Sequence, residues 1–389
     1  MRKDWEVKKL GESCLSIKDG SHNPPKGIES GSYLMLSSQN IQDGYIDFKN
    51  SRFISEDDFR KEQKRVKVKK GDLLLTIVGT IGRSCVFDGS FDNIVFQRSV
   101  AVLTPKVNIV PFFLRYFIKS KKTLLENEAK GVAQKGIYLK QLSDFKISVP
   151  PLQIQQQIVE ELDSLTSIIE KQKKQLEELD NLAQSIFYDM FGNPIENEKG
   201  WDKIKLVNVC KNKGTYGAGS SSIPKVLDRP RYIRITDILE TGELNDDYVV
   251  SSNIEDDANY LLTEGDILFA RSGATVGKTY LYRGREAQIY AGYLIKFSLN
   301  QKYVDPLFVF YITKSNDYKI WLQRQFVGVA QPNINAQKYG NLPISLPPLP
   351  LQQQFAAKIE AIEKQKELIK KSIKETEELF NSRMDYYFN

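Results

Sequence analysis

The stretch PPLQIQQQI runs from Pro150 to Ile158, and a near copy, PPLPLQQQF, runs from Pro347 to Phe355. Proline pre-sets the first turn of a helix and cannot donate a backbone hydrogen bond to a strand, so each diproline predicts a switch into a helix. The glutamines fall in the first helical turns, where they can satisfy free backbone groups or dock a globular body. A generic helix start would explain one copy, but its recurrence favours a structural junction.

The repeat extends in both directions from this junction. WEVKKL at 5–10 matches WDKIKL at 201–206, KGDLL at 70–74 matches EGDIL at 264–268, and GVAQ at 131–134 returns at 328–331. The spacing between matched segments stays between 194 and 199 residues. The chain is therefore a duplication of one unit that is too long for a solenoid repeat.

Each unit begins with short β-branched and aromatic runs bounded by Gly, Asp and Pro, such as DLLLTIVG at 72–79 and DILFARSG at 266–273. These runs predict strands. One helix is then expected from Pro111 and its counterpart from Pro306, because proline favours the first helical position. The unit body is thus predicted to be mixed α and β, dominated by strands.

After each diproline the hydrophobic period becomes that of a helix. Apolar residues recur at alternating spacings of four and three, which predicts a coiled-coil seam, with polar exceptions at Lys366, Thr376 and Arg383. A lone helix would leave this stripe in water, so we expect two helices of about 35 residues, about 50 Å long, to pair with each other. The predicted seam residues are Ile158, Leu162, Leu165, Ile169, Leu176, Leu179, Ile186, Phe355, Ile359, Ile362, Ile369, Ile373 and Phe380.

Composition excludes several classes of protein. No apolar run approaches the roughly 20 residues of a membrane span, and three scattered cysteines argue against a disulfide frame or a zinc site. We therefore expect a cytoplasmic protein. His22 is the only histidine, which excludes a multi-histidine metal site. The net charge of +6 permits a polyanionic partner but does not by itself indicate one.

Two motifs suggest enzymatic chemistry and fall short of it. GATVGKT at 273–279 is similar to a nucleotide-binding P-loop, but it has one residue too few between its glycines, and the strand-like TYLY follows where a helix should start. HNPPKG at 22–27 is similar to the Asn-Pro-Pro-aromatic motif of DNA amino-methyltransferases, but Lys26 stands where the aromatic ring should be. No catalytic or metal site is predicted, and nucleotide hydrolysis at 273–279 remains the enzymatic alternative.

The order of the repeated elements resembles a known family. A Trp motif, KGDLL, GVAQ, PPLxxQQQ and a heptad helix, each occurring twice over essentially the whole chain, resemble the specificity (S) subunit of type I DNA restriction-modification systems. The resemblance implies an α+β fold in which two strand-rich target recognition domains are separated by two long helices that pair as an antiparallel coiled coil with pseudo-two-fold symmetry. The implied domains are 1–149 and 193–346 for recognition, and 150–192 and 347–389 for the spacer helices.

The same resemblance implies a non-catalytic subunit that reads a bipartite, asymmetric target in double-stranded DNA. Half-sites read from one face of DNA lie about 34–36 Å apart, which helices of this length can span. The implied partners are two methyltransferase subunits, which would bind S-adenosylmethionine, and, where present, two restriction motor-nuclease subunits, which would use ATP and Mg. No cofactor is expected on this chain.

Candidate DNA contacts lie in loops that differ between the two units but border matched strands. Arg and Lys suit guanine, Asn and Gln suit adenine, and other polar groups hold phosphate. In the first unit the candidates are His22, Lys26, Ser37, Gln39, Asn40, Thr80, Arg83, Gln97, Arg98 and Gln134. In the second unit they are Tyr216, Ser220, Ser221, Arg231, Arg234, Thr236, Arg271, Lys278, Tyr293 and Gln331.

A different class of function stays open at this point. Two strand-rich modules on a coiled coil could also form a structural adaptor that binds proteins and no DNA. Steeply salt-dependent DNA binding would distinguish the two, because phosphate contacts release counterions.

Overall fold

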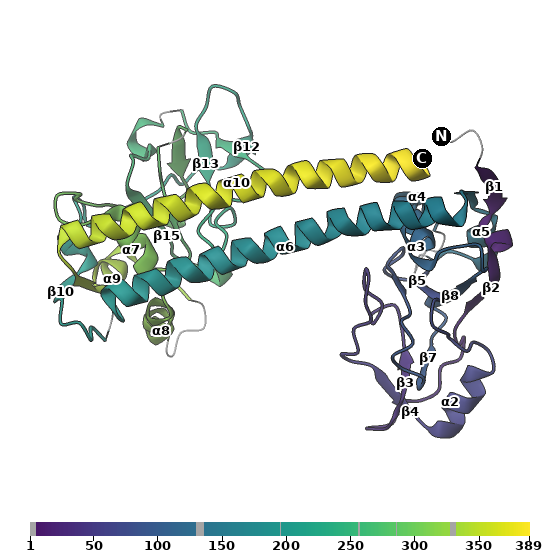
Figure 1. Cartoon of the computed structure of the whole chain (residues 1–389). Helices are drawn as coiled ribbons and strands as arrows, with labels where there is room; N and C mark the ends of the chain where they lie inside the picture. The colour runs from purple at the N-terminus through teal and green to yellow at the C-terminus, as the bar shows by residue number, and fades with distance from the viewer. Residues whose placement is uncertain (1–4, 130–135, 195, 256, 285, 327–331) are drawn as a thin grey trace. The chain divides into compact units, whose positions relative to one another are not determined.

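The computed structural model describes residues 5–129, 136–194, 196–255, 257–284, 286–326 and 332–389 (Figure 1). Both copies of GVAQ, and with them Gln134 and Gln331, lie outside the described residues. The chain divides into two compact units, Met1–Lys173 with Lys371–Asn389, and Lys174–Lys370. None of the described helices is long and apolar enough to cross a membrane.

The first unit is built on three sheets. A four-stranded sheet has the order β2-β8-β5-β6, a three-stranded sheet has the order β4-β3-β7, and β1 pairs with β9. The strands are β1 (Glu6–Lys9), β2 (Cys14–Asp19), β3 (Tyr33–Leu36), β4 (Arg52–Ile54), β5 (Leu73–Thr76), β6 (Ser84–Val86), β7 (Ile94–Phe96), β8 (Val100–Pro105) and β9 (Lys146–Val149). The helices are α1 (Leu10–Ser13), α2 (Glu56–Gln63), α3 (Pro111–Ser120), α4 (Lys122–Glu128), α5 (Leu139–Asp144) and the first part of α6 (Leu152–Phe191).

Strand β5 is buried on both faces, because its side chains alternate between two cores. Leu73 and Leu75 pack with the helices, in the cluster that contains Phe113. Leu74 packs on the other face, with Phe96 of the three-stranded sheet. This explains the unbroken apolar run that predicted the strand.

The second unit repeats this design. Its four-stranded sheet has the order β11-β18-β15-β16, and β13 pairs in parallel with β17, as β3 does with β7. The strands are β10 (Asp202–Lys205), β11 (Thr215–Tyr216), β12 (Ser222–Pro224), β13 (Arg231–Ile233), β14 (Val250–Ser252), β15 (Asp266–Ala270), β16 (Thr279–Leu281), β17 (Gln288–Tyr290), β18 (Leu294–Ser298) and β19 (Pro343–Leu346). The helices are α7 (Pro306–Ile312), α8 (Asn316–Gln325), α9 (Ala336–Gly340) and the first part of α10 (Leu349–Phe388). The predicted α+β fold with two strand-rich units and two long helices is confirmed.

The expectation of one helix after Pro111 and one after Pro306 is wrong in detail, because each is divided in two. In the second unit Ser315 is the N-cap of α8 and its side chain accepts a hydrogen bond from the amide of Tyr318, so a new helix starts there. In the first unit Lys121 separates α3 from α4, with ψ at 7° instead of the helical value.

The diproline junctions lie where they were predicted, between β9 and α6 and between β19 and α10. Only one glutamine of each triplet is buried: Gln155 and Gln352 have no exposed surface. Gln155 Oε1 accepts from the amide of Val110 at 2.8 Å, and its Nε2 donates to the carbonyls of Asn108 and Pro150. The expectation that these glutamines dock the globular body is confirmed.

Gln352 makes the same kind of contact in the second unit. Its Oε1 accepts from the amide of Asp305 at 2.8 Å, and its Nε2 donates to the carbonyl of Pro347 at 2.8 Å. Val110 and Asp305 each precede the proline that begins α3 or α7. The glutamine therefore ties the start of the long helix to the start of the helix that packs beneath it.

The two long helices, each 40 residues long, run antiparallel where they meet (Figure 1). In the first unit Glu161 of α6 binds Arg383 of α10, and Gln172 Nε2 donates to Ser372 Oγ at 2.7 Å. In the second unit Phe187 lies 5.6 Å from Phe355, centroid to centroid. Residues later in α6 thus contact residues earlier in α10, as expected for an antiparallel pair.

The predicted seam residues are buried or half-buried. The buried ones are Ile158, Leu162, Leu179, Phe355, Ile359, Ile362, Ile373 and Phe380. The half-buried ones are Leu165, Ile169, Leu176, Ile186 and Ile369. Several of these residues also pack against the unit bodies, beside Phe187 and Phe191, which the seam pattern did not include.

Lys366 places a charge in this apolar seam. Its side chain is 9% exposed, and its Nζ lies 2.6 Å from Asp180 Oδ1 and 3.3 Å from Glu363 Oε1. Desolvation opposes its charge, but the hydrogen bond to Asp180 and the nearby carboxylates raise the pKa of Lys366. Lys366 therefore stays charged because it is paired with carboxylates, although burying this charge costs free energy.

Replacing this lysine by an apolar side chain of similar length is expected to be neutral or stabilising. Lys366→Met removes the desolvation cost and extends the apolar seam, so we expect a change in unfolding free energy between zero and about +2 kcal/mol. Thermal unfolding of the full chain, compared with Lys364→Met on the exposed face of the same helix, measures it. A loss of stability would show that the ion pair is needed to hold the helices together.

Candidate nucleic-acid interface

Three loops of the first unit meet beyond the ends of its strands. The backbone amide of Ser38 donates to Ser99 Oγ at 3.0 Å, Thr80 Oγ1 donates to the carbonyl of Ser38, and Arg83 Nη1 donates to Gln42 Oε1 at 3.0 Å. We call segments 37–42, 79–83 and 97–99 the first loop cluster. It contains the candidate residues Ser37, Gln39, Asn40, Thr80, Arg83, Gln97 and Arg98. Gln42 was not singled out, although the polar run SSQNIQD that contains it was a usable signal.

Asn40 lies inside this cluster and not on its surface. It is 3% exposed, its Oδ1 accepts from the amide of Ser37, and its Nδ2 donates to the carbonyls of Asp47 and Lys49. Its side chain holds the loop closed, which leaves Gln39 exposed at the tip.

His22 and Lys26 lie on an exposed loop beside the first loop cluster. The amide of Arg98 donates to the carbonyl of Ser21 at 2.9 Å, which joins this loop to segment 97–99. His22 Nε2 lies 2.6 Å from Asp19 Oδ2, and Arg65 binds the other oxygen of Asp19 at 2.9 Å. Lys26 is exposed.

In the second unit the side chain of Arg271 packs on the ring of an exposed tyrosine. The Arg271 guanidinium is 4.9 Å from the Tyr216 ring centroid, and the Arg271 amide donates to the carbonyl of Tyr293 at 3.1 Å. Tyr293 is 62% exposed. Within the described part of the chain, Arg271 Nε is buried without a hydrogen-bond partner. A planar cation held on an aromatic face is suited to stacking and to bidentate recognition.

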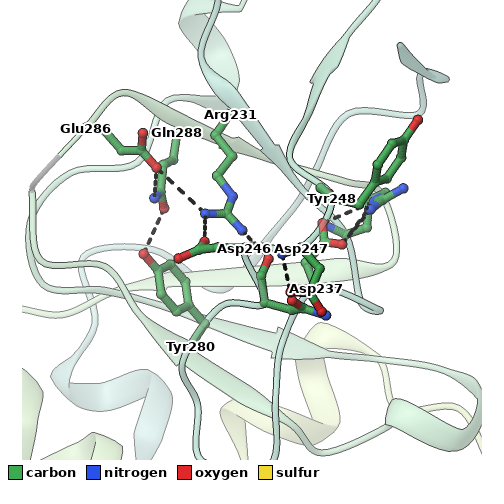
Figure 2. A network of polar contacts seen from close by, with 10 residues as sticks. Arg231, Asp237, Asp246, Asp247, Tyr248, Tyr280, Glu286 and Gln288 are labelled. Atoms are coloured by element: carbon green, nitrogen blue, oxygen red, sulfur yellow. Dashed lines mark hydrogen bonds and ion pairs between the residues drawn. The ribbon is translucent and has the colours of Figure 1, made fainter. Parts of the chain in front are cut away.

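Figure 2 shows a polar network in which Arg231 is enclosed. Its side chain is 7% exposed, its Nη1 binds Asp246, and its Nη2 donates to the carbonyl of Asn245 at 2.6 Å. Tyr280, on β16 of the neighbouring four-stranded sheet, donates to Oε1 of Gln288, and the side-chain amide of Gln288 donates to Glu286. Arg231 therefore fixes the loop that leads to β14 and presents no free guanidinium.

Arg234 lies in the same region with more of its surface accessible. Its Nη2 binds Asp237 Oδ1 at 2.7 Å, and its guanidinium lies 5.7 Å from the ring of Tyr248, which is 64% exposed. The hydrogen bond to Asp237 raises the pKa of Arg234.

The remaining candidates of the second unit lie on neighbouring loops. Lys278 Nζ lies 3.2 Å from Glu240 Oε1, and Ser220 Oγ is hydrogen-bonded to Ser252 Oγ. Ser221 and Thr236 are exposed.

Backbone hydrogen bonds show which loop positions are equivalent in the two units. Asn40 donates to the carbonyl of Ser37 as Asp237 does to that of Arg234. The carbonyl of Arg83 accepts from the amide of Thr76, the last residue of β5, and the carbonyl of Lys278 accepts from the amide of Ala270, the last residue of β15. Ile77 donates to Ser99 as Arg271 does to Tyr293. One scaffold thus presents different side chains at matched places.

The P-loop-like motif lies in this turn. Gly273–Thr275 forms a single 3-10 turn, and strand β16 follows at Thr279. A P-loop requires a helix there, so the segment lacks the required context. Among the described residues, no three His, Cys, Asp or Glu side chains come together as metal ligands.

The comparisons with known proteins agree with this architecture. The chain matches the family described as "Type I restriction modification DNA specificity domain" over residues 2–181 and 186–378. It is 25% identical to the type I restriction enzyme MjaVIII specificity subunit of Methanocaldococcus jannaschii, over 95% of this chain and 90% of that protein. It is 35% identical to the EcoBI specificity subunit of Escherichia coli over 185 residues, which cover 46% of this chain and 38% of the relative.

Two solved structures share the fold. The S subunit of a type I restriction-modification system from M. genitalium aligns with a TM-score of 0.57 at 14% identity, covering 99% of this chain and 96% of its own. A chain from a structure of type I R-M complex assembly and conformational transition aligns with a TM-score of 0.59 at 17% identity, covering 99% and 97%. The chain belongs to the type I restriction-modification DNA specificity family and is the non-catalytic specificity subunit of such a complex.

Proposed function

We propose that each unit reads one half of a bipartite, asymmetric target in double-stranded DNA. This proposal rests on one observation: the two units share the same backbone scaffold but carry different side chains at equivalent positions. Ser37 is replaced by Arg234, and Ser99 by Tyr293, at positions fixed by the same backbone hydrogen bonds. Different side chains on one scaffold favour two different half-sites, because bases are read by side-chain chemistry.

The individual contacts are part of this proposal. The exposed or half-buried groups, such as Gln39, Arg83, Arg271 and Lys278, would reach bases or phosphates. Asn40 and Arg231 would act by positioning, since their side chains are buried and bound to their own loops. Gln134 and Gln331 lie outside the described residues and stay candidates from the sequence alone.

The partners are two methyltransferase subunits, which bring S-adenosylmethionine, and, where the system has them, two restriction subunits, which bring ATP and Mg. Exposed apolar side chains on the long helices support such docking, because an exposed leucine or isoleucine on a paired helix gains from being covered. They are Leu152, Ile168, Leu182, Leu368 and Leu379.

Co-expression with methyltransferase subunits, followed by sequencing that detects methylated adenines, tests this function. We expect methylation at one split, asymmetric motif, and none when the methyltransferase is expressed alone. A palindromic or continuous motif would contradict reading by two different units. No methylation, together with no salt-dependent DNA binding by the co-purified complex, would favour the protein-binding adaptor.

A further inference from the structure

One lysine recurs in both units outside the loops considered so far. The sequence YFIKS at 116–120 returns as YITKS at 311–315. The hydroxyl after each lysine donates to the carbonyl three residues earlier, Ser120 to Phe117 and Ser315 to Ile312, at 2.7 Å in both cases. Lys119 and Lys314 are therefore structurally equivalent, although the neighbouring loops have diverged.

In the second unit Lys314 lies in a groove with a volume of about 1100 Å³. Its Nζ donates to the carbonyl of Glu240 at 3.2 Å and lies 4.7 Å from the Phe310 ring centroid. Lys278 and Lys319 line the same groove. Desolvation, reinforced by these two cations and opposed by Glu240, lowers the pKa of Lys314 to about 8. Because desolvation disfavours this ammonium, an anion bound beside it would be stabilising.

In the first unit the equivalent lysine also lies near other cations and an aromatic ring, which come from different positions than in the second unit. Lys119 is exposed, and its Nζ lies 4.9 Å from the Phe380 ring centroid. Partial desolvation and the charges of Arg115 and Lys122 lower the pKa of Lys119, and Asp43 opposes them.

The opposing carboxylates also correspond. Asp43 and Glu240 lie two residues after Ile41 and Ile238, which form matching bridges with Ile46 and Leu244. Each unit thus holds one equivalent lysine among further cations, with one carboxylate from the same turn.

We propose that the Lys119 and Lys314 clusters each hold phosphates of the DNA backbone beside the base-reading loops. This inference rests on the proposed function and deepens it. The base-reading positions differ between the units because the two half-sites differ, whereas the sugar-phosphate backbone is the same at both. A lysine kept at one place in both units suits that shared ligand, because it binds phosphate as a point charge without reading sequence.

The neighbouring segments support a duplex as the occupant. Lys278 is the last residue of the turn that is equivalent to 79–83, and Glu240 lies in the segment that begins with Arg234. DNA lying on those loops would bring its backbone within reach of the groove. Glu240 is 83% exposed at its side chain and is bound to Lys278, so a phosphate can replace it at little cost.

The test is DNA affinity of the full chain, co-purified with its methyltransferase, measured by fluorescence anisotropy on a duplex of about 30 base pairs at several salt concentrations. Lys314→Ala should weaken binding uniformly across sequences, by about threefold to tenfold, and reduce the slope of log affinity against log salt by about one unit. Lys119→Ala should do the same. Lys314→Arg should keep the slope.

Two further variants separate phosphate binding from a structural role. Glu240→Gln should strengthen binding by about twofold to fivefold, since it removes a competing carboxylate. Lys302→Ala removes an exposed lysine on the N-terminal side of α7. It should leave both the DNA affinity and the slope of log affinity against log salt unchanged.

The pH dependence gives an independent readout. The groove around Lys314 is lined by charged groups from the body of the unit and from the long helices. Those of the body are Arg231, Glu240, Glu243, Asp246, Lys278, Arg283, Glu286 and Lys319, and those of the long helices are Asp180, Glu363, Lys366, Glu367 and Lys370. A bound phosphate raises the pKa of Lys314 above its free value of about 8. Affinity should therefore be full below pH 8 and fall as pH rises above it, and Lys314→Arg should remove that fall.

The outcomes are distinguishable. Unchanged slopes in both lysine variants and unchanged affinity in Glu240→Gln, with a wild type that binds DNA, would overturn the inference and leave the proposed function intact. Loss of methyltransferase assembly without loss of DNA affinity would also overturn it, since the cluster would then serve an acidic protein surface. A wild-type complex that binds no duplex would overturn the proposed function itself.

Discussion

Removing residues 171–177 from α6 together with 368–374 from α10 is expected to shorten the gap between the half-sites. Seven residues correspond to about 10 Å of helix, or about three base pairs at 3.4 Å each. The two segments face each other across the helix pair, since Gln172 contacts Ser372. Seven residues are also two turns of a coiled coil, so the seam stays in phase on both sides.

The deletion removes the buried Ile373 and the Lys370–Glu243 ion pair, but it keeps the helix contacts on both sides of the removed segments. Arg383 stays opposite Glu161, and Lys366 stays opposite Asp180, because both members of each pair lie on the same side of the deleted segments. Sequencing of methylated adenines should show loss of the original spacing and a new motif with the same half-sites closer together. An unchanged gap would exclude the helices as the spacer.

Deleting 171–177 from α6 alone is the matched control. It shifts one helix against the other by about 10 Å, so the seam residues on one side of the deletion lose their partners. We expect loss of stability and of methylation at every spacing.

Gln155→Ala is expected to destabilise the first unit by about 2–4 kcal/mol. It leaves the amide of Val110 and the carbonyls of Asn108 and Pro150 buried without their partner, and each such group costs about 1–3 kcal/mol, with incomplete additivity. Gln352→Ala should have a similar but smaller effect in the second unit, where two such bonds are lost.

Native-state hydrogen exchange measures each effect in its own unit. The amides at the start of α3 should lose protection in Gln155→Ala, and those at the start of α7 in Gln352→Ala. The exposed neighbours provide controls: Gln156→Ala and Gln353→Ala should change stability by less than about 0.5 kcal/mol. Equal effects at Gln155 and Gln156 would contradict the docking role.

The duplication and the long helices were predictable because they depend on local patterns that occur twice in the sequence. Proline at the junction and the alternating apolar spacing act within a few residues. Which glutamine of each triplet is buried depends on a contact 45 or 47 residues away, to Val110 or Asp305. No local pattern carries that information.

The candidate DNA contacts show the same limit. The comparison of the two repeats paired Arg83 with Lys278, and backbone hydrogen bonds show that these positions are equivalent. The burial of Arg231 was not predictable, because it depends on Asp246 and Asn245 folding back across the sheet. The equivalent lysines Lys119 and Lys314 were visible in the repeated YxxKS, but their desolvation and the cations near them depend on tertiary structure.

The packing of α3 has a consequence for the order of events on the ribosome. Phe113 lies 5.3 Å from Phe388, and Tyr116 lies 6.2 Å from Phe380, so the first unit is completed by the last turns of α10. The second unit is one continuous segment, Lys174–Lys370. At about 5–20 residues per second, α10 is synthesised tens of seconds after α3, so the aromatic face of α3 stays uncovered during that time. We therefore expect the unit that is translated first to finish folding last.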